Sequence, residues 1–85
     1  MKVKLLFFAA LREQLGSSAE DIELPPEVET VAALRAHLMS RGDAWASALV
    51  ATRSLRVAVN QDIAQPGTVI RAGDEVAFFP PVTGG

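Results

Sequence analysis

The chain ends in two glycines, Gly84 and Gly85, and the carboxylate of the second is the group best suited to chemistry. Glycine has no Cβ, so a Gly-Gly end can pass through a channel too narrow for any side chain. A carboxylate becomes a good electrophile once one oxygen is made a leaving group, as in an acyl-adenylate. A sulfur donor could then displace AMP and leave a terminal thiocarboxylate, a transferable sulfur that requires no cysteine.

The residues just before the two glycines are typical of a stem that leaves a sheet. Pro80 and Pro81 fix φ and lack an N–H donor, and Val82 and Thr83 follow them. At about 3.3 Å per residue, residues 80–85 could extend roughly 20 Å from the domain. A loose end is the other interpretation, because a terminal Gly-Gly alone arises by chance in roughly one chain in 200.

The side chains offer little other chemistry. The sequence has no cysteine and one histidine, which excludes disulfides, thiol nucleophiles and cysteine-ligated zinc. We expect His37 to be structural or solvated, because a lone imidazole has no second ligand beside it. Asp74 and Glu75 are adjacent carboxylates, but they follow Gly73 and are typical of a turn. We therefore predict neither a metal site nor a catalytic side chain.

Composition limits the class of protein. A chain of 85 residues, with 49% hydrophobic and 21% charged residues, suits one small globular domain over residues 1–85, with an extended tail at 79–85. The net charge of -2 gives no basis for binding nucleic acid. Lys2 and Lys4 interrupt the only apolar stretch near the N-terminus, so no segment approaches the roughly 20 residues of a membrane span. We expect a cytoplasmic protein.

Apolar alternation predicts the strands of a sheet. The expected strands, with a short extended piece at 69–70, are Lys2–Ala9, Glu20–Leu24, Leu55–Val59 and Val76–Phe79. In the third strand, the alternation places Leu55, Val57 and Val59 inward and Arg56 and Ala58 outward. Residues 60–62, Asn-Gln-Asp, indicate a turn after it.

Helical segments separate these strands. A short helix is expected over Leu11–Leu15, with Gly16 in a left-handed cap. Thr30 should cap the main helix, which carries Val31, Leu34 and Leu38 and stops near Arg41 and Gly42. Asp43 is expected to cap a third, short helix with Trp45 and Leu49 on one side. The order predicts an α+β fold, a mixed sheet of about four to five strands covered by one main helix.

Four segments carry a resemblance to a known family. They are VKLLFFAALRE at 3–13, TVAALRAHL at 30–38, AVNQ at 58–61 and GDEVAFFPPVTGG at 73–85, and the last is the most specific. The chain resembles the ubiquitin-like β-grasp family, and within it the small subunits of molybdopterin synthase. The resemblance runs nearly end to end, and the length suits this subunit better than the shorter thiamine sulfur carrier.

The resemblance implies a sulfur-transfer cycle. A ubiquitin-activating-type adenylyltransferase would consume ATP to form the Gly85 adenylate, and a sulfurtransferase would convert it to the thiocarboxylate. The tail would then enter the large catalytic subunit of the synthase, in an expected heterotetramer. There it would deliver sulfur to cyclic pyranopterin monophosphate, which builds the dithiolene of molybdopterin. The large subunit would supply the pocket and a lysine, and this chain would bind no cofactor itself.

The resemblance also implies a partner surface. The first and last strands are neighbours in β-grasp folds, so Phe8 and Phe79 would lie together on the face away from the helix. Exposed apolar patches of this kind usually contact a partner, although a covering loop is the alternative. Arg12 could add a rim salt bridge or be simply solvated. The expected interface is therefore Phe8, Phe79 and Arg12, with the stem at Pro80, Pro81, Val82 and Thr83.

Three other functions remain open. A thiamine-thiazole sulfur carrier or a ubiquitin-like modifier joined to protein lysines would share the tail chemistry and differ in the acceptor. A non-covalent interaction module would have an inert tail. ATP/pyrophosphate exchange with an activating enzyme would distinguish this last class, because an inert tail supports none.

Overall fold

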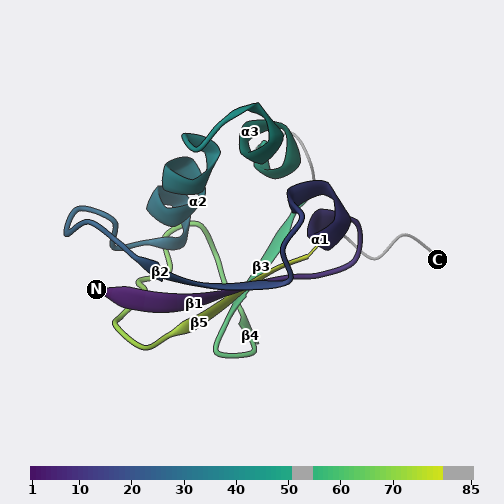
Figure 1. Cartoon of the computed structure of the whole chain (residues 1–85). Helices are drawn as coiled ribbons and strands as arrows, with labels where there is room; N and C mark the ends of the chain where they lie inside the picture. Colours follow the sequence, from purple (N-terminus) through teal and green to yellow (C-terminus); the bar gives the residue numbers. More distant parts are fainter. Residues whose placement is uncertain (51–54, 80–85) are drawn as a thin grey trace.

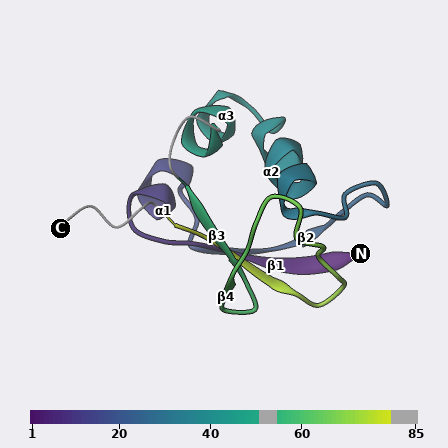
Figure 2. The ribbon, with the colours of Figure 1, turned by 180° about the vertical axis from the view of Figure 1, so that it is seen from behind.

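The computed structural model describes residues 1–50 and 55–79, which form one sheet with three helices over one face (Figures 1 and 2). The elements, in chain order, are β1 Lys2–Phe7, α1 Ala10–Leu15, β2 Ala19–Glu23, α2 Val31–Met39, α3 Asp43–Leu49, β3 Arg56–Val59, β4 Asp62–Ile63 and β5 Glu75–Phe79. Figure 1 shows all three helices above the sheet, and no helix of the described ranges lies below it. We call the lower face the open face.

The sheet is mixed and has the strand order β2-β1-β5-β3-β4. β1 and β5 lie side by side at its centre and run parallel, and every other neighbouring pair is antiparallel. The first and last strands of the chain are therefore neighbours, which confirms the α+β prediction and the expected pairing. β5 ends at Phe79, so the sheet itself sets the point from which residues 80–85 continue.

The core lies between the sheet and the helices. Val3, Leu5 and Phe7 of β1 point into it, as the alternation predicts. Phe7 and Phe78 stack with ring centroids 5.8 Å apart, and Trp45 of α3 meets the Phe7 ring edge-on at 5.5 Å. α2 is the longest of the three described helices. α1 and α3 also cover the core, because α1 buries Leu11 and α3 buries Ala48 and Leu49.

Local signals place two helix ends as predicted. Gly16 has φ +72° in the left-handed region, and its N–H donates to the Arg12 carbonyl. The Thr30 hydroxyl accepts a 3.2 Å hydrogen bond from the Ala33 N–H and caps α2. α2 ends at Met39 with Ser40 as its C-cap, slightly before the predicted stop.

The predicted cap of α3 is wrong. Gly42 occupies the N-cap with φ +149°, and Asp43 is already the first helical residue, with no side-chain capping bond. A positive φ favours glycine over any residue with a Cβ, so Gly42 takes the position that the carboxylate pattern suggested for Asp43. The Asp43 carboxylate still lies in the first helical turn, where the helix dipole favours a negative charge.

At the β3–β4 edge, one further prediction needs correction and one is confirmed. Residues 60–62 were expected to be a turn, but Asp62 already starts β4, because Asn60 and Gln61 alone make the turn with φ of +50° and +73°. Ala58 does face outward, yet it is only 7% exposed, because neighbouring strands flank it on both sides. The extended piece at 69–70 contributes a single bridge between Val69 and Thr30.

Candidate functional site

Three of the predicted site residues, Phe8, Arg12 and Phe79, lie within the described ranges. The predictions for Gly84 and Gly85, and for the stem at 80–83, lie outside the described residues.

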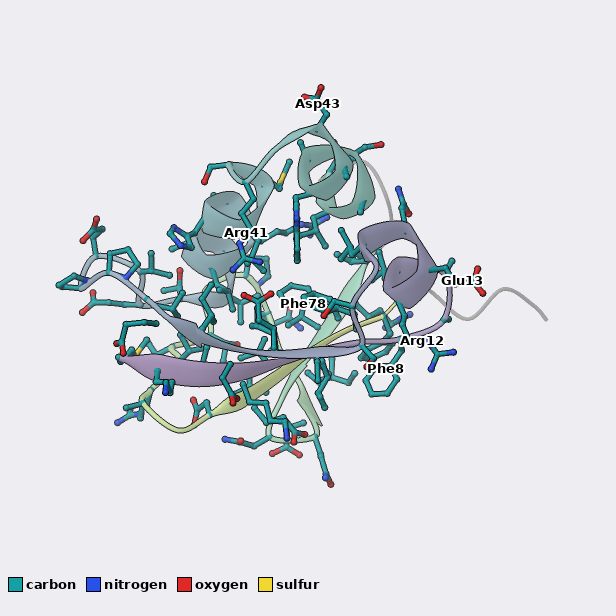
Figure 3. The ribbon with its side chains drawn as sticks, in the orientation of Figure 1. Phe8, Arg12, Glu13, Arg41, Asp43 and Phe78 are labelled. Carbon is teal, nitrogen blue, oxygen red and sulfur yellow. The ribbon has the colours of Figure 1, made fainter. Side chains whose placement is uncertain are left out.

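Phe8 and Phe79 each follow the last pair of residues in register between β1 and β5. Phe7 and Phe78 are Cα partners across β1 and β5, and the Phe8 N–H donates to the Phe78 carbonyl at 3.2 Å. Because side chains alternate along a strand, Phe8 and Phe79 point away from the core. Figure 3 shows Phe8 below the sheet and Phe78 above it, between the sheet and the helices. Phe8 is 47% exposed, and Phe79 is half-buried.

Apolar residues cross the open face in register with one another. Leu6 of β1 pairs with Ala77 of β5, which pairs with Ala58 of β3, and Ala58 pairs with Ile63 of β4. Ile63 is 60% exposed, so the row ends in an accessible isoleucine at the sheet edge. This row and the two phenylalanines form what we call the open-face patch, which consists of Leu6, Phe8, Ala58, Ile63, Ala77 and Phe79.

Charged residues occupy the other half of the open face. Lys4 of β1 lies between Asp21 of β2 and Glu75 of β5 in the strand register, and Lys2 lies opposite Glu23. Opposite charges on adjacent strands are favourable and keep this half of the sheet hydrated. The apolar half is therefore the one beside Phe79, where the chain continues toward its C-terminal residues.

Two arginines border the open-face patch. Arg12 of α1 is exposed, and Figure 3 shows it at the same end of the molecule as Phe8. Arg56 is the Cα partner of Phe79 on β3 and is also exposed. No carboxylate of residues 1–50 and 55–79 lies within ion-pair distance of either guanidinium. The sequence pattern predicts Arg12 but not Arg56 as an interface residue, because only the strand register places Arg56 beside Phe79.

A strained turn follows Phe8 directly after the end of β1, and the sequence pattern did not predict it. The strand was expected to run to Ala9, but it ends at Phe7, and Ala9 has φ +53° and ψ −131°. The Leu11 N–H donates to the Phe8 carbonyl at 3.2 Å and closes a tight turn around Ala9 and Ala10. Only glycine adopts such a φ without steric cost.

The adjacent carboxylates weighed in the sequence have a structural role at the turn. Asp74 accepts hydrogen bonds from the Arg71 N–H at 2.8 Å and from the Asn60 side-chain amide at 3.0 Å, which confirms the predicted turn chemistry. The Asn60 carbonyl oxygen in turn accepts from the Glu75 N–H at 3.0 Å. His37 is half-buried on α2. Over the described ranges, no cluster of three His, Cys, Asp or Glu side chains could hold a metal ion.

No helix of the described residues is long and apolar enough to cross a membrane.

The strand order, the parallel pair of β1 and β5, and the helix α2 packed over one face of the sheet define the class as a ubiquitin-like β-grasp protein. The fold matches the crystal structure of SAMP1 from Haloferax volcanii with a TM-score of 0.76, 28% identity and full coverage of both chains. The chain belongs to the ThiS family, whose model matches residues 5–85.

Relatives and one complex extend this comparison. The chain is 46% identical to the molybdopterin synthase sulfur carrier subunit of Haemophilus influenzae and 47% identical to that of Escherichia coli, each over 98% of this chain and 99% of the relative. The fold also matches a chain in the complex of subunits 1 and 2 of the molybdopterin-converting factor from Helicobacter pylori, with a TM-score of 0.68, 22% identity and full coverage of both chains. At that identity the match concerns the fold alone.

Proposed function

We propose that this chain is the sulfur-carrier subunit of a molybdopterin synthase and acts in the cytoplasm. The observation that carries the proposal is the identity of 46–47% to two molybdopterin synthase sulfur carrier subunits over nearly their whole length. The family match reaches residue 85, so it includes the C-terminal Gly-Gly that the chemistry requires.

The reacting group is the Gly85 carboxylate. One carboxylate oxygen attacks the α-phosphate of ATP in the activating enzyme, which releases pyrophosphate and leaves the acyl-adenylate. Hydrosulfide supplied by a sulfurtransferase then attacks the Gly85 carbonyl carbon, AMP leaves with the electron pair of the broken C–O bond, and loss of the S–H proton gives the thiocarboxylate. Gly84 has no Cβ and lets the end of the chain enter a narrow channel. On the large subunit, the thiocarboxylate sulfur forms a bond to cyclic pyranopterin monophosphate, and water then cleaves the bond between this sulfur and the Gly85 carbonyl carbon, which restores the Gly85 carboxylate.

The open-face patch supplies the surface on which the large subunit docks. It combines exposed aromatic and aliphatic side chains, and its position at the end of β5 puts it beside the segment that must reach the partner. Phe8 and Phe79 are the anchors, because buried aromatic residues contribute most to such interfaces. Arg12 and Arg56 at the rim favour a partner surface with carboxylates around an apolar centre.

Intact mass measurement and reconstitution test the carrier function. Protein purified from its own cells should include a fraction in which one sulfur replaces one oxygen. In a reconstituted reaction with the activating enzyme, ATP, a sulfur source and the large subunit, the full chain should yield molybdopterin. A chain ending at Gly84 has the same carboxylate withdrawn by roughly 3.5 Å and should yield almost none, since about 1 Å of misplacement can lower a rate on the order of a hundredfold. Near-normal product from it would favour the inert interaction module.

A modifier function is the second candidate, because the fold also matches SAMP1, a small archaeal modifier protein, at 28% identity over the full chain. The Gly85 adenylate would then react with a lysine amine to form an isopeptide bond, and the thiocarboxylate would not accumulate. Lysates probed for this chain would show covalent adducts of higher mass in place of the sulfur-substituted protein. A thiamine-thiazole carrier would give the same sulfur-substituted mass and would assemble with a different acceptor enzyme.

A further inference from the structure

A groove lies at the β3–β4 edge, between α2 and the start of β3. It is a groove of about 650 Å³, within the usual size range of ligand sites. Apolar side chains form both walls: Ala32, Ala36 and Met39 on the α2 side, and Leu55, Val57 and Pro66 on the other. The groove meets the open face along the sheet edge, where Arg56 and Ile63 belong to both surfaces.

Arg35 brings a positive charge into this groove. Its Nε donates to the Leu49 carbonyl at 2.6 Å and its Nη2 to the Val50 carbonyl at 2.8 Å, which fixes the guanidinium at the end of α3. Burial among these neighbours lowers the pKa of Arg35. Among the described residues no carboxylate lies within ion-pair distance of Arg35, and no Asp or Glu lines the groove.

The strand that forms one wall is only partly covered on its outer side. β4 pairs with Ala58 and Val59 alone, and the Ala64 N–H donates to the Val57 carbonyl at 2.8 Å. Pro66 follows two residues later and has no N–H to continue the pairing. An extended chain could therefore lie along the groove beside the first half of β3, as peptides do when they dock at a sheet edge.

We propose that this groove docks an extended segment of a partner protein that carries apolar side chains and at least one carboxylate. The apolar walls account for the apolar side chains, and Arg35 accounts for the carboxylate, because a charge-assisted pair with arginine is strong where water is partly excluded. The segment binds beside the open-face patch, with which the groove shares Ile63, and does not depend on the tail chemistry. The groove therefore gives this protein a second contact with a partner, next to the one proposed above.

Peptide titration of the isotope-labelled full chain tests this proposal by NMR. The probe is a blocked peptide of about six residues, long enough to span roughly 20 Å, in which valine alternates with aspartate. Its control replaces every aspartate by asparagine. The aspartate peptide should cause saturable shift changes at the amides of Ala32, Ala36 and Met39, with none at Leu6 or Ala77. The asparagine peptide should bind about tenfold more weakly, since it lacks the charge-assisted hydrogen bond.

Two variants in the groove, with one control outside it, test where the peptide binds. Arg35→Gln should weaken the aspartate peptide about tenfold, whereas Arg71→Gln, an exposed arginine outside the groove, should leave binding unchanged. Because Arg35 also holds the end of α3, Ala36→Glu provides an independent test: it places a negative charge in the groove and should abolish binding without lowering the melting temperature.

Several outcomes would overturn the proposal. Equal binding of both peptides, shift changes confined to the open face, or no saturable change at any amide would each do so. Tighter binding of decanoate than of the peptide at the same amides would assign the groove to a small amphiphile instead. None of these outcomes affects thiocarboxylate formation, so a failure here is distinct from a failure of the carrier function.

Discussion

Phe7 and Phe78 are Cα partners across the parallel β1–β5 pair, and their rings stack 5.8 Å apart in the core. Phe8, which follows the last residue of β1, and Phe79, the last residue of β5, point to the opposite face, because side chains alternate along a strand. The pair Phe7 and Phe78 therefore stabilises the domain, whereas Phe8 and Phe79 belong to the open-face patch. This separation lets the two faces be changed independently.

Phe8→Asp should weaken assembly with the large subunit by about 2 kcal/mol or more, as for a buried aromatic anchor, with little change in the melting temperature. Val69→Asp is the matched control, because Val69 is 55% exposed and lies outside the patch. A pull-down read beside a thermal melt makes the measurement. If Phe8→Asp binds normally, Phe8 is not an anchor of this interface.

Phe78→Ala should behave in the opposite way. Its side chain is fully buried against Phe7, so truncation should cost about 3–5 kcal/mol of folding free energy through lost contacts and a cavity. Urea unfolding followed by circular dichroism gives this value. A loss below about 1 kcal/mol, the range of an ordinary surface substitution, would contradict the placement of Phe78 in the core.

Gly84→Val tests the narrow channel separately from the reach of the chain. The Gly85 carboxylate keeps its position along the sequence, and only a branched side chain and a stiffer backbone are added. We expect the variant to fold and to bind the large subunit through the open-face patch, but to yield little adenylate. Pyrophosphate exchange with the activating enzyme measures this step. Exchange at the wild-type rate would show that no such constriction exists at residue 84.

Ala9→Gly should stabilise the domain by about 1 kcal/mol, because glycine relieves the steric cost of a positive φ and this exceeds its added entropy in the unfolded chain. Ala10→Gly is the matched control, since Ala10 begins α1, where glycine should instead destabilise by roughly 0.5–1 kcal/mol. Thermal melts of both variants decide the point. Equal destabilisation by the two changes would rule out a strained turn at Ala9.

The Glu20–Arg41 pair should make stability depend on pH in the acid range. The Arg41 guanidinium donates to both Glu20 oxygens, at 2.9 and 2.5 Å, and lies 4.6 Å from the centre of the Trp45 ring. Hydrogen bonding to Arg41 lowers the pKa of Glu20 below its ordinary value of 4.5. A folded-state pKa below the unfolded one gives stability that is complete above pH 4.5 and is lost as pH falls through the lowered value.

Comparison of the wild type with Glu20→Gln measures this effect. The stability difference should be no more than about 1 kcal/mol near neutral pH, because the pair is partly exposed, and it should shrink toward zero below the pKa of Glu20. Glu27→Gln, an exposed carboxylate outside the pair, serves as the control. A Glu20→Gln difference that stays constant from neutral to acid pH would exclude the ion pair as its cause.

Local sequence patterns determined much of this protein. The alternation in β1 decides which side chains face the core, because successive strand residues point to opposite faces whatever lies beside them. Gly16 and Thr30 determine helix ends through their own backbone and hydroxyl chemistry. The C-terminal Gly-Gly pointed to the carboxylate as the reacting group, since this inference needs only the absence of side chains and not their placement.

Only the tertiary structure decided which distant residues meet. The β3–β5 register places Arg56 beside Phe79 and buries Ala58, and no periodicity within β3 could predict either result, because pairing joins segments about twenty residues apart. β4 was missed because two residues carry no detectable alternation. Arg35 gains its role from carbonyls of α3 and from the wall opposite it. Patterns along the chain predict which side chains share a face and which residues cap a helix. Grooves and contacts between distant residues depend instead on how the elements pack against one another.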